Sequence, residues 1–225
     1  MNLYQNFKMK YSNILTNQNI SIGLIWLFHV SGIIGIIYSD ASWFIKATPL
    51  NLMVSFILLL LNIERSKKIL FLVLLCFSVG MLSEIIGVKH GFIFGKYSYG
   101  NALGPKFIEV PLMMGIVWCI LVFITGFIVQ LFFDTIWARI IVGIALMLFL
   151  DLVIEPVAPV LDFWTFESGL ASYHNYIGWA ATAFPLQLLF HKAKLKIDGS
   201  FAFHLYFLQF LFFTILLLKV NTLGI

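Results

Sequence analysis

Seven long apolar runs, separated by short polar connections, constrain this chain more than any other feature of its sequence. A helix that spans the hydrocarbon core of a bilayer needs about 20 mostly apolar residues. The runs cover residues 20–38, 47–63, 69–88, 110–133, 140–161, 176–190 and 201–218, of which the second and sixth are short. They are continuous and lack the alternating pattern of barrel strands. We therefore predict an all-α fold, a polytopic transmembrane bundle of about seven helices.

The composition supports this interpretation. Hydrophobic residues make up 61% of the 225 residues and charged residues only 11%, against about 25% charged in an ordinary soluble domain. A soluble bundle of this size could not bury so much apolar surface, which excludes a soluble globular domain, a disordered chain and a disulfide scaffold. We expect a polar N-terminal segment at residues 1–19 and a single transmembrane domain at residues 20–225.

The basic residues indicate how the bundle is oriented. They lie in short clusters between the apolar runs and form no extended stripe, so a nucleic-acid partner is not expected. Nine of the fourteen Lys and Arg residues fall on the side of the N-terminus, which favours a cytoplasmic N-terminus under the positive-inside rule. The N-terminal stretch lacks the pattern of a cleaved signal peptide. We expect an integral protein of a prokaryotic inner (cytoplasmic) membrane, in contact with membrane lipid.

Three of the ten carboxylates are costly to keep in such a bundle. The other seven fall in predicted loops or at a helix entrance, whereas Glu84, Asp151 and Glu155 lie within apolar runs. An ionised side chain at mid-bilayer costs roughly 2.5–3.5 kcal/mol on insertion scales, and intramembrane acids are functional candidates for that reason. Asp151 and Glu155 are four residues apart, so a helix stacks them on one face. Pro156 is expected to kink or end that helix.

Two carboxyl groups in an apolar setting favour a proton on one of them, which could then serve as a general acid. Each acid could instead bind a backbone group or pair with Lys89, Lys96 or Lys106, which lie on the same side of the membrane. The five histidines show no spacing of three or four residues typical of helical metal ligands. We expect neither a metal nor another cofactor.

The loop at residues 90–106 is rich in glycine and aromatic residues. In an extended segment, Tyr97 and Tyr99 point to a common face. An interfacial aromatic belt would also explain tyrosines here, but such a belt does not need the glycines. This loop and the connection at residues 162–175 are predicted on the same side of the bundle, which suggests a site at that end.

At these residues the sequence resembles the membrane carotenoid 1,2-hydratases, a carotenoid biosynthesis protein family that includes the bisanhydrobacterioruberin hydratase type. The resemblance covers about residues 80–179 and rests on three blocks. They are Glu84-x-x-Gly87-Val88 with Gly91-x-x-Phe94-Gly95-x-Tyr97-x-Tyr99, Leu103-Gly104-Pro105-Lys106 and Val110-Pro111; Asp151-x-x-x-Glu155-Pro156 with Trp164; and Asn175-Tyr176-x-Gly178-Trp179. The chain departs from the family pattern at Glu155, where Asp is usual, and at residues 171–174, where a Gly-x-Pro element is common.

The resemblance implies addition of water across the terminal C1=C2 bond of an acyclic carotenoid such as lycopene or γ-carotene. In this hypothesis Asp151 is the general acid, and Glu155 and Glu84 are its proton partner, the base for water or site-ordering groups. Aromatic faces at Tyr97, Tyr99, Trp164 and Trp179 would stabilise a carbocation. The third block adds Asn175 to the substrate-binding residues.

The resemblance implies a cofactor-independent hydro-lyase, and other carotenoid biosynthesis enzymes are candidate partners. Three alternatives stay open at this point: a carotenoid end-group cyclase, a proton-coupled membrane transporter, and a non-catalytic scaffold for pigment enzymes.

Overall fold

The computed structural model describes residues 17–195 and 199–219, so most of the expected polar segment at residues 1–19 lies outside the described part. The described residues form eight helices and four very short strands. The helices are α2 (Asn17–Tyr38), α3 (Ala41–Lys46), α4 (Thr48–Leu61), α5 (Lys67–His90), α6 (Leu112–Phe132), α7 (Ile136–Ile154), α8 (Tyr173–Lys192) and α9 (Ser200–Lys219). The strands are β1 (Tyr97–Tyr99), β2 (Lys106–Phe107), β3 (Val110–Pro111) and β4 (Trp164–Phe166).

The prediction of an all-α polytopic bundle is confirmed. Each of the seven apolar runs contains one long helix, and five of these helices are long and apolar enough to cross a membrane. The two that do not qualify are α4, with only 14 residues, and α8, which carries more polar residues. They come from the second and sixth runs, which are also the shortest in the sequence. The short helix α3 between the first two runs was not anticipated.

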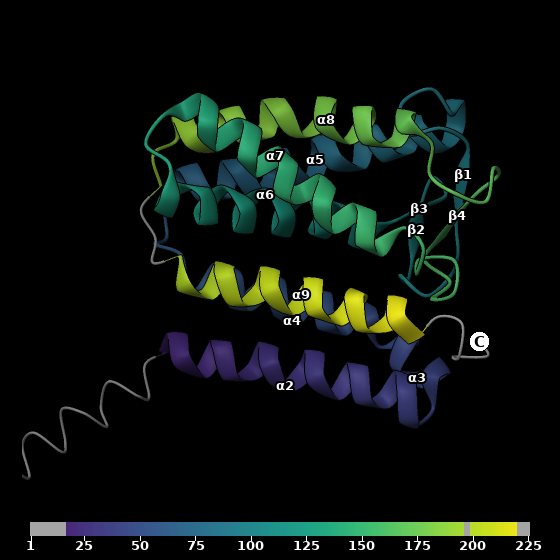
Figure 1. The fold of residues 1–225 in the computed structure, drawn as a ribbon. Helices are drawn as coiled ribbons and strands as arrows, with labels where there is room; N and C mark the ends of the chain where they lie inside the picture. The colour runs from purple at the N-terminus through teal and green to yellow at the C-terminus, as the bar shows by residue number, and fades with distance from the viewer. Residues whose placement is uncertain (1–16, 196–198, 220–225) are drawn as a thin grey trace, which may run out of the picture.

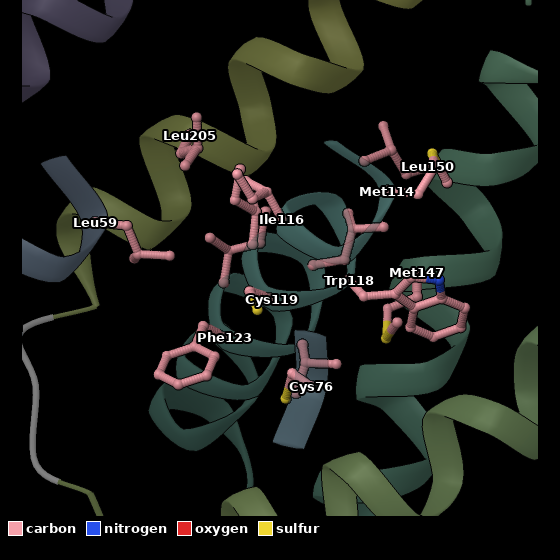
Figure 2. Packing of buried hydrophobic residues seen from close by; sticks show 14 of the residues in the cluster. Leu59, Cys76, Met114, Ile116, Trp118, Cys119, Phe123, Met147, Leu150 and Leu205 are labelled. Atoms are coloured by element: carbon pink, nitrogen blue, oxygen red, sulfur yellow. The ribbon is translucent and has the colours of Figure 1, made fainter. Parts of the chain in front are cut away.

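Helix α6 forms the centre of the bundle, because the other parts of the protein bury 89% of its most apolar 18-residue stretch. In Figure 1 the long helices run side by side, with α2 at one edge of the bundle and α8 near the opposite edge. Figure 2 shows side chains of α6 pointing in several directions: Met114 lies near Leu150 of α7, and Trp118 lies beside Met147 of the same helix. This burial on all sides explains why the run at residues 110–133 shows no polar face.

The two longest polar connections meet at one end of the bundle, as the sequence predicts (Figure 1). Strand β1, from the connection between α5 and α6, pairs antiparallel with β4, from the connection between α7 and α8. In this register Tyr97 lies opposite Phe166 and Tyr99 opposite Trp164. Asp162 fixes the same two connections, since its Oδ2 accepts a hydrogen bond from the backbone N–H of Asn101 (2.8 Å).

Helix α7 ends about two turns before the end of the apolar run at residues 140–161. The run extends to residue 161, but the helix stops at Ile154 and residues 155–161 form turns. Pro156 accounts for the end, because it has no N–H to donate back into the helix and its ring clashes with the preceding turn. Glu155 is therefore the C-cap residue, and its backbone N–H still donates to the carbonyl of Asp151 (2.9 Å). The expected kink or end is confirmed as an end.

Candidate active site

Glu84 is a buried acid in α5 whose carboxyl oxygens each meet hydrogen-bonding side chains. Its Oε2 accepts from the hydroxyls of Tyr97 (2.6 Å) and Tyr99 (2.7 Å), and its Oε1 accepts from Nε1–H of Trp118 (3.0 Å). An indole N–H can only donate. Bonds of this kind to an ionised oxygen are shorter and stronger than neutral ones. We name Glu84 with Tyr97, Tyr99 and Trp118 the Glu84 cluster.

The two tyrosines of this cluster remain donors over a wide pH range. Both are buried, and burial raises the pKa of Tyr97 and Tyr99 well above the usual value for tyrosine, with the charge of Glu84 acting in the same direction. Their rings stand edge to face, with centroids 5.5 Å apart. The extended conformation of β1 places both side chains on the same face of the strand, as the spacing of two residues predicts.

Two glycines of α5 make room for the partners of Glu84. Gly80 and Gly87 lie four residues before and three residues after Glu84, so all three share one helix face. A Cβ atom on Gly80 would lie 2.4 Å from the indole of Trp118, and one on Gly87 would lie 3.0 Å from the hydroxyl of Tyr97. Neither ring could approach Glu84 so closely if these positions carried side chains.

Asp151 and Glu155 form a second cluster, held together by Asn175 of α8. The Nδ2 amide of Asn175 donates to Oδ2 of Asp151 (2.9 Å) and to Oε1 of Glu155 (3.2 Å), while Nε1–H of Trp164 donates to Oε2 of Glu155 (3.3 Å). One amide thus holds the two carboxyl groups close together, and close carboxyl groups in an apolar setting favour a proton on one of them. We name Asp151, Glu155 and Asn175 the acid pair and its bridge.

A small hollow of about 10 Å³ lies between the two clusters, and we name it the acid hollow. Its wall includes seven of the eight residues singled out from the sequence: Glu84, Tyr97, Tyr99, Glu155, Trp164, Asn175 and Trp179. The eighth, Asp151, is not on this wall and lies behind Asn175 and Glu155. A polar space of this volume has room for about one water molecule.

Sequence reasoning missed several residues of the site, and Trp118 is the most important. Its indole stacks on Trp179, with ring centroids 4.3 Å apart and an angle of 17°. Tryptophan in membrane proteins is typical of the interfaces, and a buried indole N–H usually finds a partner. A tryptophan well inside an apolar run was therefore a usable signal. Phe94, Phe166 and Met114 also line the hollow, but their residue types gave no such signal.

The loop lysines do not neutralise the three acids. Lys106 Nζ donates to the backbone carbonyl of Tyr99 (2.7 Å), and Lys96 lies 3.8 Å from Glu167 in an ion pair exposed to solvent. Among residues 17–195 and 199–219, no ion pair joins a lysine to Glu84, Asp151 or Glu155. Within the same residues, no group of three or more His, Cys, Asp or Glu side chains is arranged to hold a metal ion.

Comparisons with known proteins point to one family. The family model described as "Carotenoid biosynthesis protein" matches residues 46–224, which include both clusters. A curated relative from Haloarcula japonica, named bisanhydrobacterioruberin hydratase, is 28% identical over 136 residues, or 57% of this chain and 46% of the relative. The chain thus spans less than half the length of that relative. No solved structure gives a significant match.

Proposed function

Because the chain belongs to the carotenoid biosynthesis protein family, we propose that it is a carotenoid hydratase that adds water across the terminal C1=C2 bond of an acyclic carotenoid. The observation that carries this proposal is the acid hollow. It is a space of about one water molecule, lined by Glu155 of the acid pair together with Glu84 and aromatic rings. Lycopene and γ-carotene are the substrates to test first.

The acid pair supplies the proton. We assign proton delivery to Glu155, because it lines the hollow and Asp151 does not, and we assign Asp151 as its proton partner through the shared Asn175 amide. This assignment moves the delivering role from Asp151, where the sequence alone puts it, to its neighbour. Transfer of the proton to C2 breaks the C1=C2 π bond and leaves a tertiary cation at C1.

Aromatic rings around the hollow stabilise that cation. The ring of Tyr99 stands edge to face with Trp164 at a centroid distance of 6.2 Å, and both line the hollow. A ring face attracts a cation within about 6 Å of its centroid. Glu84 adds a nearby negative charge, and its three donors hold that charge in place. Such pre-oriented charge contributes more in a site that excludes bulk water.

Water capture completes the cycle. The oxygen of a water molecule in the hollow bonds to C1, and the water gives one proton to the carboxylate that Glu155 became in the first step. Glu84 is the poorer base, because three hydrogen bonds already stabilise its charge. The enzyme returns to its starting state, and the product is a tertiary alcohol. The addition of water changes no net oxidation state, so the reaction requires no electron carrier.

The test is expression of the protein in a host that makes lycopene, followed by mass spectrometry of its pigments. We expect a product heavier by one water, and growth in water labelled with heavy oxygen should place the label in the new hydroxyl group. Glu155→Gln should lower conversion by about a hundredfold or more, within the usual contribution of a general acid. Glu167→Gln is the matched control, because Glu167 lies in the same connection and is 72% exposed.

Two outcomes would contradict the proposal. An isomer of unchanged mass would indicate cyclisation, which begins with the same cation but ends with loss of a proton. An unchanged pigment profile in cells that contain folded protein would exclude both reactions on this substrate. Full activity of Glu155→Gln would remove the acid pair from the mechanism even if the product were correct.

A further inference from the structure

Two more hollows lead away from the acid hollow toward the edge of the bundle. The first, which we name the middle hollow, has a volume of about 60 Å³ and lies between α4, α6, α7 and α9. It shares Met114 and Trp164 with the acid hollow. Its wall is apolar apart from the side chains of Thr48 and Gln209.

The second, which we name the outer hollow, has a volume of about 160 Å³ and lies between α2, α3, α4 and α9. It shares Thr48 with the middle hollow, and none of its wall residues is charged. Two of them, Trp43 and Leu50, are 62% and 59% exposed, so the outer hollow opens at the surface of the bundle. That surface is apolar and lies on helices that pack at the edge of the bundle in Figure 1.

The three hollows thus follow one line from the acid pair, past Met114 and Trp164, past Thr48, to an opening among α2, α3 and α4. We propose that an extended isoprenoid chain lies along this line, with its reacting end in the acid hollow and its far end emerging into lipid beside α2 and α3. This inference rests on the proposed function for the identity of the reacting end. The line carries no charge before it reaches the carboxyl groups, which matches a hydrocarbon chain that ends at an acid.

The volumes of the three hollows are too small for a polyene, so the isoprenoid chain must displace side chains as it enters. Met114 stands at the junction of the middle and acid hollows and points toward α7 beside Leu150 in Figure 2. Methionine is unbranched and adapts its shape easily, which suits it to a position that must yield to substrate. The opening is built largely by α2 and α3, and α2 lies wholly before the region that the family model matches. Recognition of the far end of the substrate is therefore a property of this chain's own N-terminal helices.

Bulky substitutions at Thr48, where the outer and middle hollows join, and at Asn51 of the outer hollow test the inference. Thr48→Trp and Asn51→Trp would block the proposed path at a point that a short substrate does not reach. Ile57→Trp is the matched control, because Ile57 lies on the exposed side of the same helix. Purified proteins in detergent would be supplied with lycopene or with a short acyclic terpene that carries the same end group. A tryptophan at either position would occupy space that the long chain needs, and a tenfold loss corresponds to about 1.4 kcal/mol.

We expect both variants to lose about tenfold or more on lycopene while keeping the wild-type rate on the short terpene, and Ile57→Trp to match the wild type on both. Equal rates on lycopene for all three variants would overturn the inference, and so would equal losses on both substrates. A second readout is independent of turnover: the wild type should retain visible pigment through purification, and Thr48→Trp should lose it. If the wild type converts neither substrate, the proposed function fails. Pigment retention then still decides whether an isoprenoid chain lies along this line.

Discussion

Replacement of Tyr99 by Phe removes one hydrogen-bond donor from Glu84 and leaves the ring in place, which makes it a clean probe of the charge on Glu84. The Tyr99 hydroxyl donates to Oε2 at 2.7 Å, and the other two donors, from Tyr97 and Trp118, remain. A hydrogen bond to a charged group contributes about 1.5–3 kcal/mol and one between neutral groups about 0.5–1.5 kcal/mol. If Glu84 is a carboxylate, Tyr99→Phe should therefore cost about 1.5–3 kcal/mol of unfolding free energy.

The same substitution in a Glu84→Gln background should cost only about 0.5–1.5 kcal/mol, because the amide is neutral. The double-mutant cycle thus predicts a coupling of about 1–1.5 kcal/mol between the two positions. The measurement is equilibrium unfolding of the four proteins in mixed detergent micelles. Tyr206→Phe is the control, since its hydroxyl donates to the carbonyl of Leu146 (2.9 Å) away from Glu84. Its effect should add to that of Glu84→Gln within about 0.5 kcal/mol.

The result that refutes this reasoning is additivity at Tyr99. Gln is a close mimic of a protonated Glu, so a coupling below about 0.5 kcal/mol would mean that Glu84 carries a proton. Glu84 would then be a second acid rather than a fixed negative charge. The roles assigned to the two clusters would have to be exchanged, and the acid pair would become the site of the stabilising charge.

Three further predictions concern the same site. Gly87→Ala should lower conversion per folded protein several-fold, because the new Cβ lies 2.6 Å from the ring of Phe94 and 3.0 Å from the Tyr97 hydroxyl; an unchanged product yield would show that Tyr97 can shift freely. Asn175→Ala should lower the maximal rate more than the affinity for substrate, since the amide binds both acids (2.9 and 3.2 Å); a change in KM alone would make it a binding residue. Finally, absorbance titration should detect no phenolate from Tyr97 and Tyr99 in the folded protein up to about pH 10, the usual tyrosine pKa. Their raised pKa values add stability that is fully present below that pH and is lost above it, so Tyr97→Phe should make unfolding less sensitive to alkali.

Much of the fold follows from the sequence because hydropathy and helix-ending residues act locally. The seven apolar runs each contain a helix, Pro156 ends α7, and the spacing of Tyr97 and Tyr99 places them on one face of a strand. Helix α3 was missed because its six residues lie in the gap between two apolar runs and are too few to show a periodic pattern.

The grouping of the three acids could not be predicted for a different physical reason. Which acid meets which donor depends on how each helix is rotated against its neighbours, and small residues such as Gly80 set that packing. An apolar run that is hydrophobic on all sides, as in α6, carries no periodic signal of its rotation. Trp118 could therefore be placed inside the bundle from its sequence position, but not opposite Glu84.

The two clusters give the three acids different surroundings, which is the basis for the different roles that we propose for them. Glu84 meets three donors and no other carboxyl group within its hydrogen-bonding shell, an environment that suits a negative charge. Asp151 and Glu155 share one bridging amide, and two close carboxyl groups favour a proton on one of them. A site that must first donate a proton and then hold a cation requires one environment of each kind, on opposite sides of the substrate. Glu155 and Glu84 both line the acid hollow, so a substrate end group that enters it would meet both environments.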